Sequence, residues 1–228
     1  MKHSGKARKA AFKMLVVTLV LVLLVPVAGV VAAVLSVSML ALSGFVVALW
    51  FLFALFTLYF FRDPNPRVPE GPNLVVSPGH GRVDVVDTIE EPLFLGGDCR
   101  RISIFLSVFD VHVQNAPLAG RVAWYRYTEG QFLNAMRADC AAVNENVYIG
   151  LAAESPGPVR VGVRLIAGVL ARRIVPWITV GDDVSRGDRI GLIQFGSRVE
   201  LYLPLTATVK VQPGDRVVGG ETVMAVLA

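Results

Sequence analysis

The feature that most constrains this chain is a run of 48 residues, 14–61, that contains no Asp, Glu, Lys or Arg. A single membrane-spanning helix needs about 20 apolar residues, so the run is long enough for two. We expect helices near 14–35 and 40–61, with the turn at Ser36-Val37-Ser38. Pro64 and Pro66 follow directly and forbid continuation of the second helix. Residues 1–61 are therefore predicted to form a basic tail and a two-helix transmembrane hairpin.

The distribution of charge predicts the orientation of this hairpin. Five of the 22 basic residues lie in the first 13 positions, and no acidic residue precedes Asp63. Basic flanks favour the cytoplasmic side, so we expect both ends of the hairpin, and the domain after it, on the cytoplasmic face of the cell (inner or plasma) membrane. The alternative is a secretory signal peptide over about 1–33, ending at Val31-Ala32-Ala33, which would place the domain outside.

The basic tail also indicates the kind of partner. Residues 14–228 hold 17 basic and 18 acidic side chains, so the excess positive charge belongs to the tail alone. A basic segment next to a membrane helix suits an anionic membrane surface, and no nucleic-acid-binding motif is present. Cys99 and Cys140 are too far apart in sequence, and too few, to indicate a metal site or a disulfide framework.

Residues 62–228 have the pattern of a mainly β domain. Short runs rich in Val, Ile, Leu and aromatic residues alternate with turn residues. Strands are expected at 73–77, 81–86, 101–108, 120–125, 147–151 and 159–165. A strand, a Gly-Ser bend and a second strand are expected within 190–204, and a short helix or an irregular loop within 132–142.

An internal repeat refines this expectation. Residues 181–190 and 214–223 share the pattern Gly-Asp-x-Val-x-x-Gly-x-x-(Ile/Val). The pattern resembles the strand-turn-strand units of lipoyl- and biotinyl-type domains, which implies a flattened β-barrel or sandwich. Those domains carry a modifiable lysine at a hairpin tip. Lys210, the one lysine after Lys13, does not lie in such a tip, which argues against a swinging-arm carrier.

The candidate for chemistry is Phe195-Gly196-Ser197, between two apolar runs. A Gly-Ser pair inside a strand pattern is most often a β-bulge. Three other segments accompany it in order: Phe60-Phe61-Arg62-Asp63-Pro64; Phe109-Asp110-Val111-His112-Val113 with Ala116-Pro117-Leu118-Ala119-Gly120; and Ala167-Gly168 with Ala171-Arg172-Arg173-Ile174. Together the four segments resemble the short, pyruvoyl-dependent form of the phosphatidylserine decarboxylase proenzyme family.

The resemblance implies a self-processing decarboxylase. The chain would break between Gly196 and Ser197, giving a β chain, 1–196, and an α chain, 197–228. Ser197 would become a covalent pyruvoyl cofactor, which forms a Schiff base with the amine of phosphatidylserine and accepts the electrons released with CO2. The products would be phosphatidylethanolamine and CO2. The expected partners are phosphatidylserine in an anionic membrane and the two cleaved chains, with a homo-oligomer also allowed and no metal ion implied.

The resemblance and the residue types suggest the acid–base groups. His112 is the best candidate base, since an imidazole titrates near neutrality. Asp110, two residues earlier, would share a strand face with His112 and orient it, or would be a surface carboxylate. The sequence departs from the family at Ser77-Pro78-Gly79-His80-Gly81, where relatives typically have Ser-Pro-Ala-Asp-Gly. Either His80 replaces that acid, or another acid does, or processing is impaired.

The expected substrate-binding residues are Arg172, Arg173 and Phe195. The two arginines are expected in this role because guanidinium groups bind phosphodiesters well. The alternative for the arginines is a solvated basic pair. The competing function for the whole chain is a non-processed, non-catalytic membrane-anchored β-barrel paralogue that binds lipid or acts as a scaffold.

Overall fold

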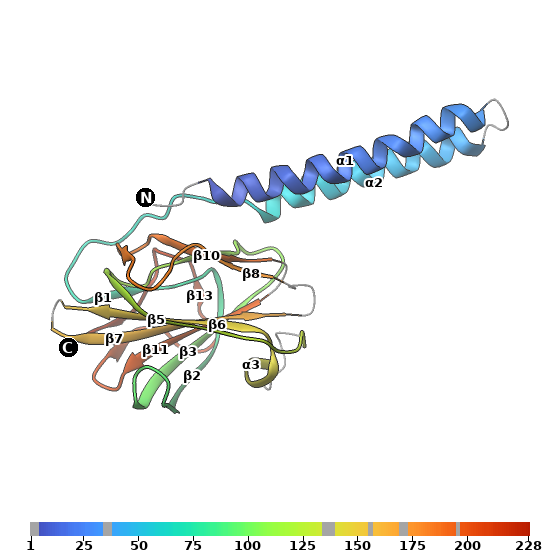
Figure 1. Cartoon of the computed structure of the whole chain (residues 1–228). Coiled ribbons are helices and arrows are strands. Elements are labelled where there is room, and N and C mark those ends of the chain that lie inside the picture. The colour runs from blue at the N-terminus through green and yellow to red at the C-terminus, as the bar shows by residue number, and fades with distance from the viewer. Residues whose placement is uncertain (1–4, 34–37, 134–139, 155–156, 169–172, 195–196) are drawn as a thin grey trace. The chain divides into compact units, whose positions relative to one another are not determined.

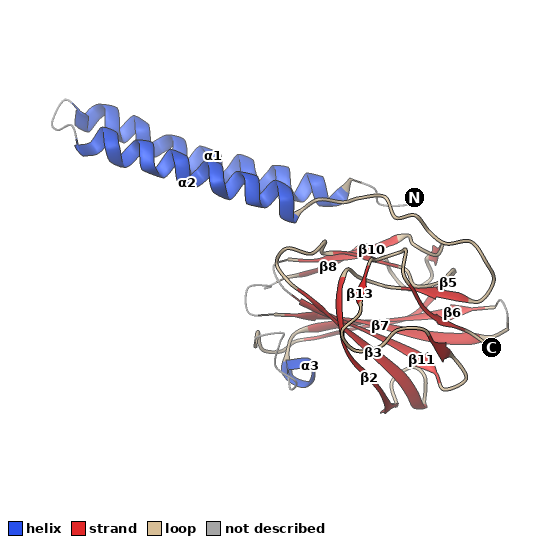
Figure 2. Ribbon diagram, turned by 180° about the vertical axis from the view of Figure 1, so that it is seen from behind, coloured by secondary structure: helices blue, strands red, loops and turns tan. Residues whose placement is uncertain are grey.

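The computed structural model describes residues 5–33, 38–133, 140–154, 157–168, 173–194 and 197–228. The chain divides into two compact units, Gly5–Asp63 and Pro64–Ala228. The first unit is helical and the second is built almost entirely from strands (Figure 2).

The helical unit contains α1, Lys6–Ala33, and α2, Ser38–Phe60, which lie side by side (Figure 1). The stretches Lys6–Val30 and Leu42–Phe60 are long and apolar enough to cross a membrane. Trp50 Nε1 in α2 donates a 3.1 Å hydrogen bond to the Thr18 hydroxyl in α1. Polar bonds of this kind join helices in an apolar environment. The prediction of two apolar helices that can form a hairpin is confirmed.

The second unit is mainly β, as predicted. Its strands and one short helix are β1 (Leu74–Val76), β2 (Gly81–Glu91), β3 (Gly97–Leu106), β4 (Val113–Asn115), β5 (Gly120–Thr128), α3 (Cys140–Val143), β6 (Asn146–Ala153), β7 (Val159–Ala167), β8 (Ile174–Pro176), β9 (Asp183–Val184), β10 (Arg189–Ile193), β11 (Ser197–Pro204), β12 (Thr208–Val209), β13 (Arg216–Val217) and β14 (Val223–Val226).

The strands form one large sheet and two small ones. The large sheet has eight strands in the order β13-β2-β3-β11-β7-β6-β5-β9 and curls into a half-barrel (Figures 1 and 2). The small sheets have the orders β4-β10-β8 and β1-β14-β12. Strand side chains alternate between the two faces, so the core face of β11 presents Val199, Leu201 and Leu203, all fully buried.

The two copies of the sequence repeat occupy equivalent places in this fold. Gly181 and Gly214 both have positive φ, 97° and 102°. Their amides donate 2.8 Å hydrogen bonds to the carbonyl oxygens of Val122 and Val83, respectively. Each of these valines is the last residue of a Gly-Arg-Val triplet, 120–122 or 81–83. Each copy of the Gly-Asp-x-Val repeat therefore pairs with one copy of this triplet. The two copies of the repeat thus make equivalent main-chain contacts in the β domain.

Candidate self-cleavage and catalytic site

Ser197 begins β11 in the middle of the large sheet. It pairs with Leu106, the last residue of β3, on one side and with Ala167, the last residue of β7, on the other. Alternation along β11 puts its side chain on the core face with Val199. The residue has no exposed surface, and its hydroxyl has no hydrogen-bond partner among the described residues. A buried hydroxyl left unpaired costs about 1–3 kcal/mol, which is a reason to expect a function for it.

The connection from β3 to β4 is tied to the chain around the predicted cleavage point at both of its ends. At one end Ser197 pairs with Leu106. At the other end the amide of Ile193 donates a 3.1 Å hydrogen bond to the carbonyl oxygen of His112. Leu106 and His112 are therefore held beside Ser197 and Ile193, on the two sides of the predicted cleavage point. The action of His112 on the Gly196–Ser197 bond stays a prediction.

The connection after β7 is tied to the same segment in the same way. Ala167 pairs with Ser197, and the amide of Gln194 donates a 3.2 Å hydrogen bond to the carbonyl oxygen of Arg173. The described ends of the connections after β3 and after β7 thus pair with the chain on either side of the predicted cleavage point. Of the predicted substrate-binding residues, Arg173 has an exposed side chain, whereas Arg172 and Phe195 lie outside the described residues, as does Gly196.

A main-chain oxygen fixes the His112 ring. His112 is fully buried, and its Nδ1 lies 2.9 Å from the carbonyl oxygen of Asp110. A carbonyl oxygen can only accept a hydrogen bond, so Nδ1 carries the proton. In the neutral ring the lone pair is then on Nε2, which is the form needed in a general base.

Asp110 and His112 do not share a strand face as expected, because both lie between the end of β3 at Leu106 and the start of β4 at Val113. The Asp110 carboxylate binds the main chain of this connection. Its Oδ2 accepts a 2.8 Å hydrogen bond from the amide of Ser107, and the Asp110 amide donates to the Ser107 carbonyl oxygen at 2.9 Å. The carboxylate thus closes the turn after β3. The contact from His112 Nδ1 is made to the main-chain oxygen of Asp110, which the sequence pattern could not distinguish from a carboxylate contact.

His80 lies just before β2, at the same edge of the sheet as Ser197. The two residues share this edge because β2 and β11 run antiparallel to β3, and β11 also runs antiparallel to β7. The first residues of β2 and β11 therefore lie beside the last residues of β3 and β7. A Cβ atom added at Gly219 would lie 2.9 Å from His80 Cδ2 and 2.8 Å from Asn115 Oδ1. The His80 ring therefore packs against Gly219 beside Asn115, near the end of β4 that is distal to His112.

The structure also shows a supporting residue that the sequence analysis missed. Asn144 is buried, and its Nδ2 donates hydrogen bonds to the carbonyl oxygens of Ala167 at 2.7 Å and Leu133 at 2.8 Å. Because Ala167 is the direct neighbour of Ser197 in the sheet, Asn144 holds one wall of the site. A lone Asn in an irregular segment carries no sequence signal for such a contact.

The opposite face of the sheet carries a polar and aromatic layer. Tyr202 donates a short hydrogen bond to the Glu200 carboxylate, and burial, together with that carboxylate, raises the pKa of Tyr202. Burial likewise raises the pKa of the Cys99 thiol to about 11. Both groups are therefore protonated at neutral pH, and neither supplies a nucleophile there.

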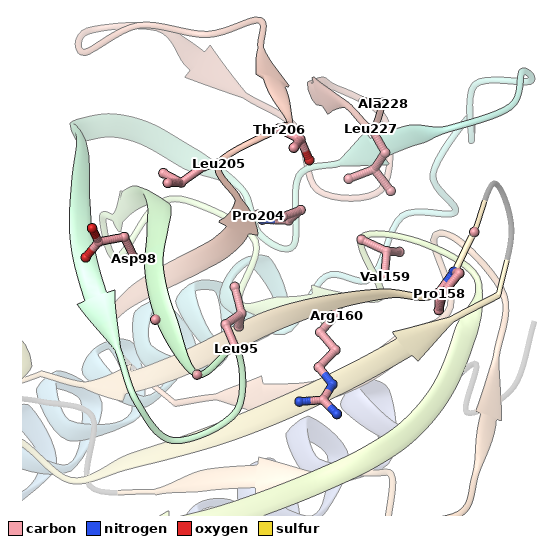
Figure 3. Close-up of a pocket in the computed structure, with 13 residues that line it drawn as sticks. Leu95, Asp98, Pro158, Val159, Arg160, Pro204, Leu205, Thr206, Leu227 and Ala228 are labelled. Carbon is pink, nitrogen blue, oxygen red and sulfur yellow. The ribbon is translucent and has the colours of Figure 1, made fainter.

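A cavity of about 450 Å³ lies at the other end of these strands (Figure 3). Its lining includes Val159 at the start of β7 and Pro204 at the end of β11. A strand rises about 3.3 Å per residue, so Pro204 is about 23 Å from Ser197 along β11. This cavity is therefore far from Ser197, and no predicted site residue lines it. Despite its size, we do not assign it as the catalytic site.

Comparison with known proteins identifies the family to which the chain belongs. Residues 53–225 match the model of the family described as phosphatidylserine decarboxylase. A phosphatidylserine decarboxylase proenzyme of Symbiobacterium thermophilum is 51% identical over 171 residues, which cover 75% of this chain and 79% of that protein. Proteins of the same name from Nocardia farcinica and Desulfotalea psychrophila are 48% and 44% identical, over 74% of this chain and 72% and 78% of their own lengths. The chain belongs to the phosphatidylserine decarboxylase family.

Proposed function

We propose that this protein is a membrane-anchored, self-processing decarboxylase that converts phosphatidylserine to phosphatidylethanolamine and CO2 with a pyruvoyl group made from Ser197. The observation that carries the proposal is the Ser197 hydroxyl, which is fully buried and unpaired among the described residues, in a chain of this family. The two loops tied to β10 and β11 by the bonds to His112 and Arg173 support it.

Self-cleavage begins with an acyl shift. The Ser197 hydroxyl gives its proton to a base while Oγ attacks the carbonyl carbon of Gly196. The peptide C–N bond breaks, the amide nitrogen takes up a proton, and an ester joins Gly196 to the side chain of residue 197. Glycine at the attacked position leaves the carbonyl open to close approach.

Elimination and hydrolysis complete the cleavage. A base removes the Cα proton of residue 197, and the Gly196 carboxylate leaves from Cβ, which gives dehydroalanine. Water then hydrolyses its imine tautomer and ammonia departs, so residue 197 ends as a pyruvoyl group. His112 Nε2 is the base for these proton transfers, because the Asp110 carbonyl oxygen holds the proton on Nδ1.

The surroundings of Ser197 fit the group that replaces it. Conversion removes the buried O–H donor that has no partner among the described residues. Once formed, a pyruvoyl group supplies an electron sink for the loss of CO2 from an amino acid headgroup. The chain's own residues hold this position from both sides, through Leu106 and Ala167, and His112 supplies or removes protons beside it.

The α1–α2 hairpin anchors the protein to the membrane that contains its substrate. The absence of charge over 14–61 and the basic residues before it support a hairpin with both ends on the cytoplasmic face. Arg173, exposed on a loop beside the site, then meets the anionic headgroup together with Arg172 and Phe195.

The test is a decarboxylation assay on the full chain in detergent micelles containing phosphatidylserine labelled at the serine carboxyl carbon. Wild-type protein should release labelled CO2 and form phosphatidylethanolamine in equal amounts, and Ser197→Ala should do neither. Activity that survives in Ser197→Ala would contradict the proposal. A wild-type chain that binds the lipid without releasing CO2 would support the non-catalytic alternative.

A further inference from the structure

Arg198, the residue next to Ser197, has a buried guanidinium that forms an ion pair with the partly exposed Asp84. Arg198 is 5% exposed and lies on the face of β11 opposite to Ser197. Its Nη2 lies 2.6 Å from Asp84 Oδ2, and its Nη1 donates a 2.6 Å hydrogen bond to the Ser103 hydroxyl. One side chain thus connects β11 to β3 and, across β3, to β2.

A bulge in β2 belongs to this arrangement. The register between β2 and β3 shifts between Val83 and Val85, so Asp84 is the extra residue. A bulge re-aims a side chain at a local cost in pairing, and bulges are common beside active sites. Here the bulged residue supplies the carboxylate that binds Arg198.

The ion pair joins the two chains that cleavage would produce. Asp84 and Ser103 lie in 1–196, whereas Arg198 is the second residue of 197–228. Before cleavage, residue 197 is held covalently on both sides. After cleavage it is a chain end held covalently only through residue 198, and chain ends fray unless they are tied down.

We propose that Arg198, bound by Asp84 and Ser103, is a positioning residue that keeps the residue-197 terminus in register with Leu106 and Ala167 after the chain is cut. The inference rests on the proposed function. Loss of Arg198 should therefore affect decarboxylation more than self-cleavage, because the covalent bond to Gly196 still restrains residue 197 in the proenzyme. Arg198 acts through the main chain and does not contact the substrate.

The test compares Arg198→Met and Arg198→Lys with a matched control, Glu200→Gln. Glu200 is in the same strand, on the same face, and 1% exposed, with Arg101 Nη1 at 3.4 Å from its carboxylate, but it is two residues further from the cut. Three quantities are measured for each full-length variant: the cleaved fraction on a denaturing gel, kcat per pyruvoyl group titrated with phenylhydrazine, and KM for phosphatidylserine in micelles.

We expect Arg198→Met to cleave and then to show a kcat per pyruvoyl group lower by about tenfold or more, since displacements near 1 Å cost about 10²-fold in rate. KM should stay near the wild-type value, Arg198→Lys should recover part of kcat, and Glu200→Gln should keep it. Amide hydrogen exchange at Val199 should be faster in cleaved Arg198→Met than in cleaved Glu200→Gln. If Arg198→Met does not fold, Ser103→Ala, which removes one contact of the same guanidinium, should lower kcat per pyruvoyl group in the same direction.

Equal losses of kcat in Arg198→Met and Glu200→Gln, or an Arg198→Met enzyme with wild-type kcat, would overturn the positioning role while leaving the proposed function intact. Wild-type kcat in Ser103→Ala would also count against that role. A wild-type protein without a titratable pyruvoyl group would instead overturn the proposed function, and this inference with it.

Discussion

The amide of Ile193 donates a 3.1 Å hydrogen bond to the carbonyl oxygen of His112, and so ties the predicted base to the strand that leads into the cleavage point. The His112 ring is fixed in turn by the Asp110 carbonyl oxygen at 2.9 Å from Nδ1. Both restraints use main-chain atoms. The Asp110 carbonyl oxygen thus favours the neutral tautomer with its proton on Nδ1 and its lone pair on Nε2.

This geometry predicts different results for the two residues of the Phe-Asp-Val-His segment. His112→Gln removes the base and should slow self-cleavage by about 10²-fold or more. Asp110→Asn keeps both the main-chain carbonyl and a side-chain oxygen that can accept from the Ser107 amide, so cleavage should stay within about tenfold of wild type. Pulse-labelled proenzyme, followed by denaturing gel, measures both rates. An Asp110→Asn chain as slow as His112→Gln would show that the carboxylate itself orients the ring.

The departure at His80 yields a second prediction. Cleavage should fall below about pH 6, because a protonated imidazole cannot accept a proton. His80→Ala should slow cleavage, and His80→Asp, which restores the family residue, should retain or increase the rate. Pulse-labelled proenzyme at several pH values tests this.

Two neighbouring glycines supply controls for the His80 variants. Gly219→Ala should also slow cleavage, since its methyl group would displace the His80 ring or Asn115. A Cβ at Gly79 would lie 2.5 Å from Gln114 Oε1, so the Ala-Asp pair of the relatives requires Gln114 to move. His80→Asp is therefore best compared with Gly79→Ala/His80→Asp. A wild-type rate in His80→Ala would mean that His80 takes no part in cleavage.

Cleavage should leave the two chains associated. The fragment 197–228 contains β11, β12, β13 and β14, of which β11 lies between β3 and β7, and β14 pairs with β1. Val199, Leu201 and Leu203 are fully buried, and each contributes about 1.5–3 kcal/mol relative to an exposed side chain. The chains should co-elute in size-exclusion chromatography without denaturant and separate in guanidinium chloride. Separation under native conditions would contradict the described sheet order.

The hairpin orientation is tested by labelling. In intact cells, an impermeant maleimide should not reach Gly5→Cys or Glu70→Cys, each introduced into a Cys140→Ser background. Cys99 should not compete for the reagent, because burial keeps the pKa of its thiol at about 11, and the neutral thiol is unreactive. External labelling of both sites would overturn the predicted orientation. External labelling at Glu70→Cys in a protein that has lost residue 5 would instead favour the signal-peptide alternative.

Local sequence patterns predict the helices and the β-rich fold well, but they predict few of the side-chain contacts in the candidate site. The uncharged run predicts both helices, and the Gly-Asp-x-Val repeat predicts the two-fold β unit, because each depends on residues near one another in the chain. The ion pair of Arg198 with Asp84 and the bond of Asn144 to Ala167 join residues far apart in sequence and leave no periodic signal. Whether Asp110 binds His112 through its side chain or its main chain is likewise decided by the turn at Ser107, which the pattern does not show.

The central claim is tested most directly by the intact mass of the purified wild-type protein under denaturing conditions. The account predicts two species, residues 1–196 with a free C-terminal carboxylate and residues 197–228 beginning with a pyruvoyl group, and one uncut chain of 24.6 kDa for Ser197→Ala. A wild-type preparation that decarboxylates phosphatidylserine yet shows only the uncut 24.6 kDa chain would contradict it.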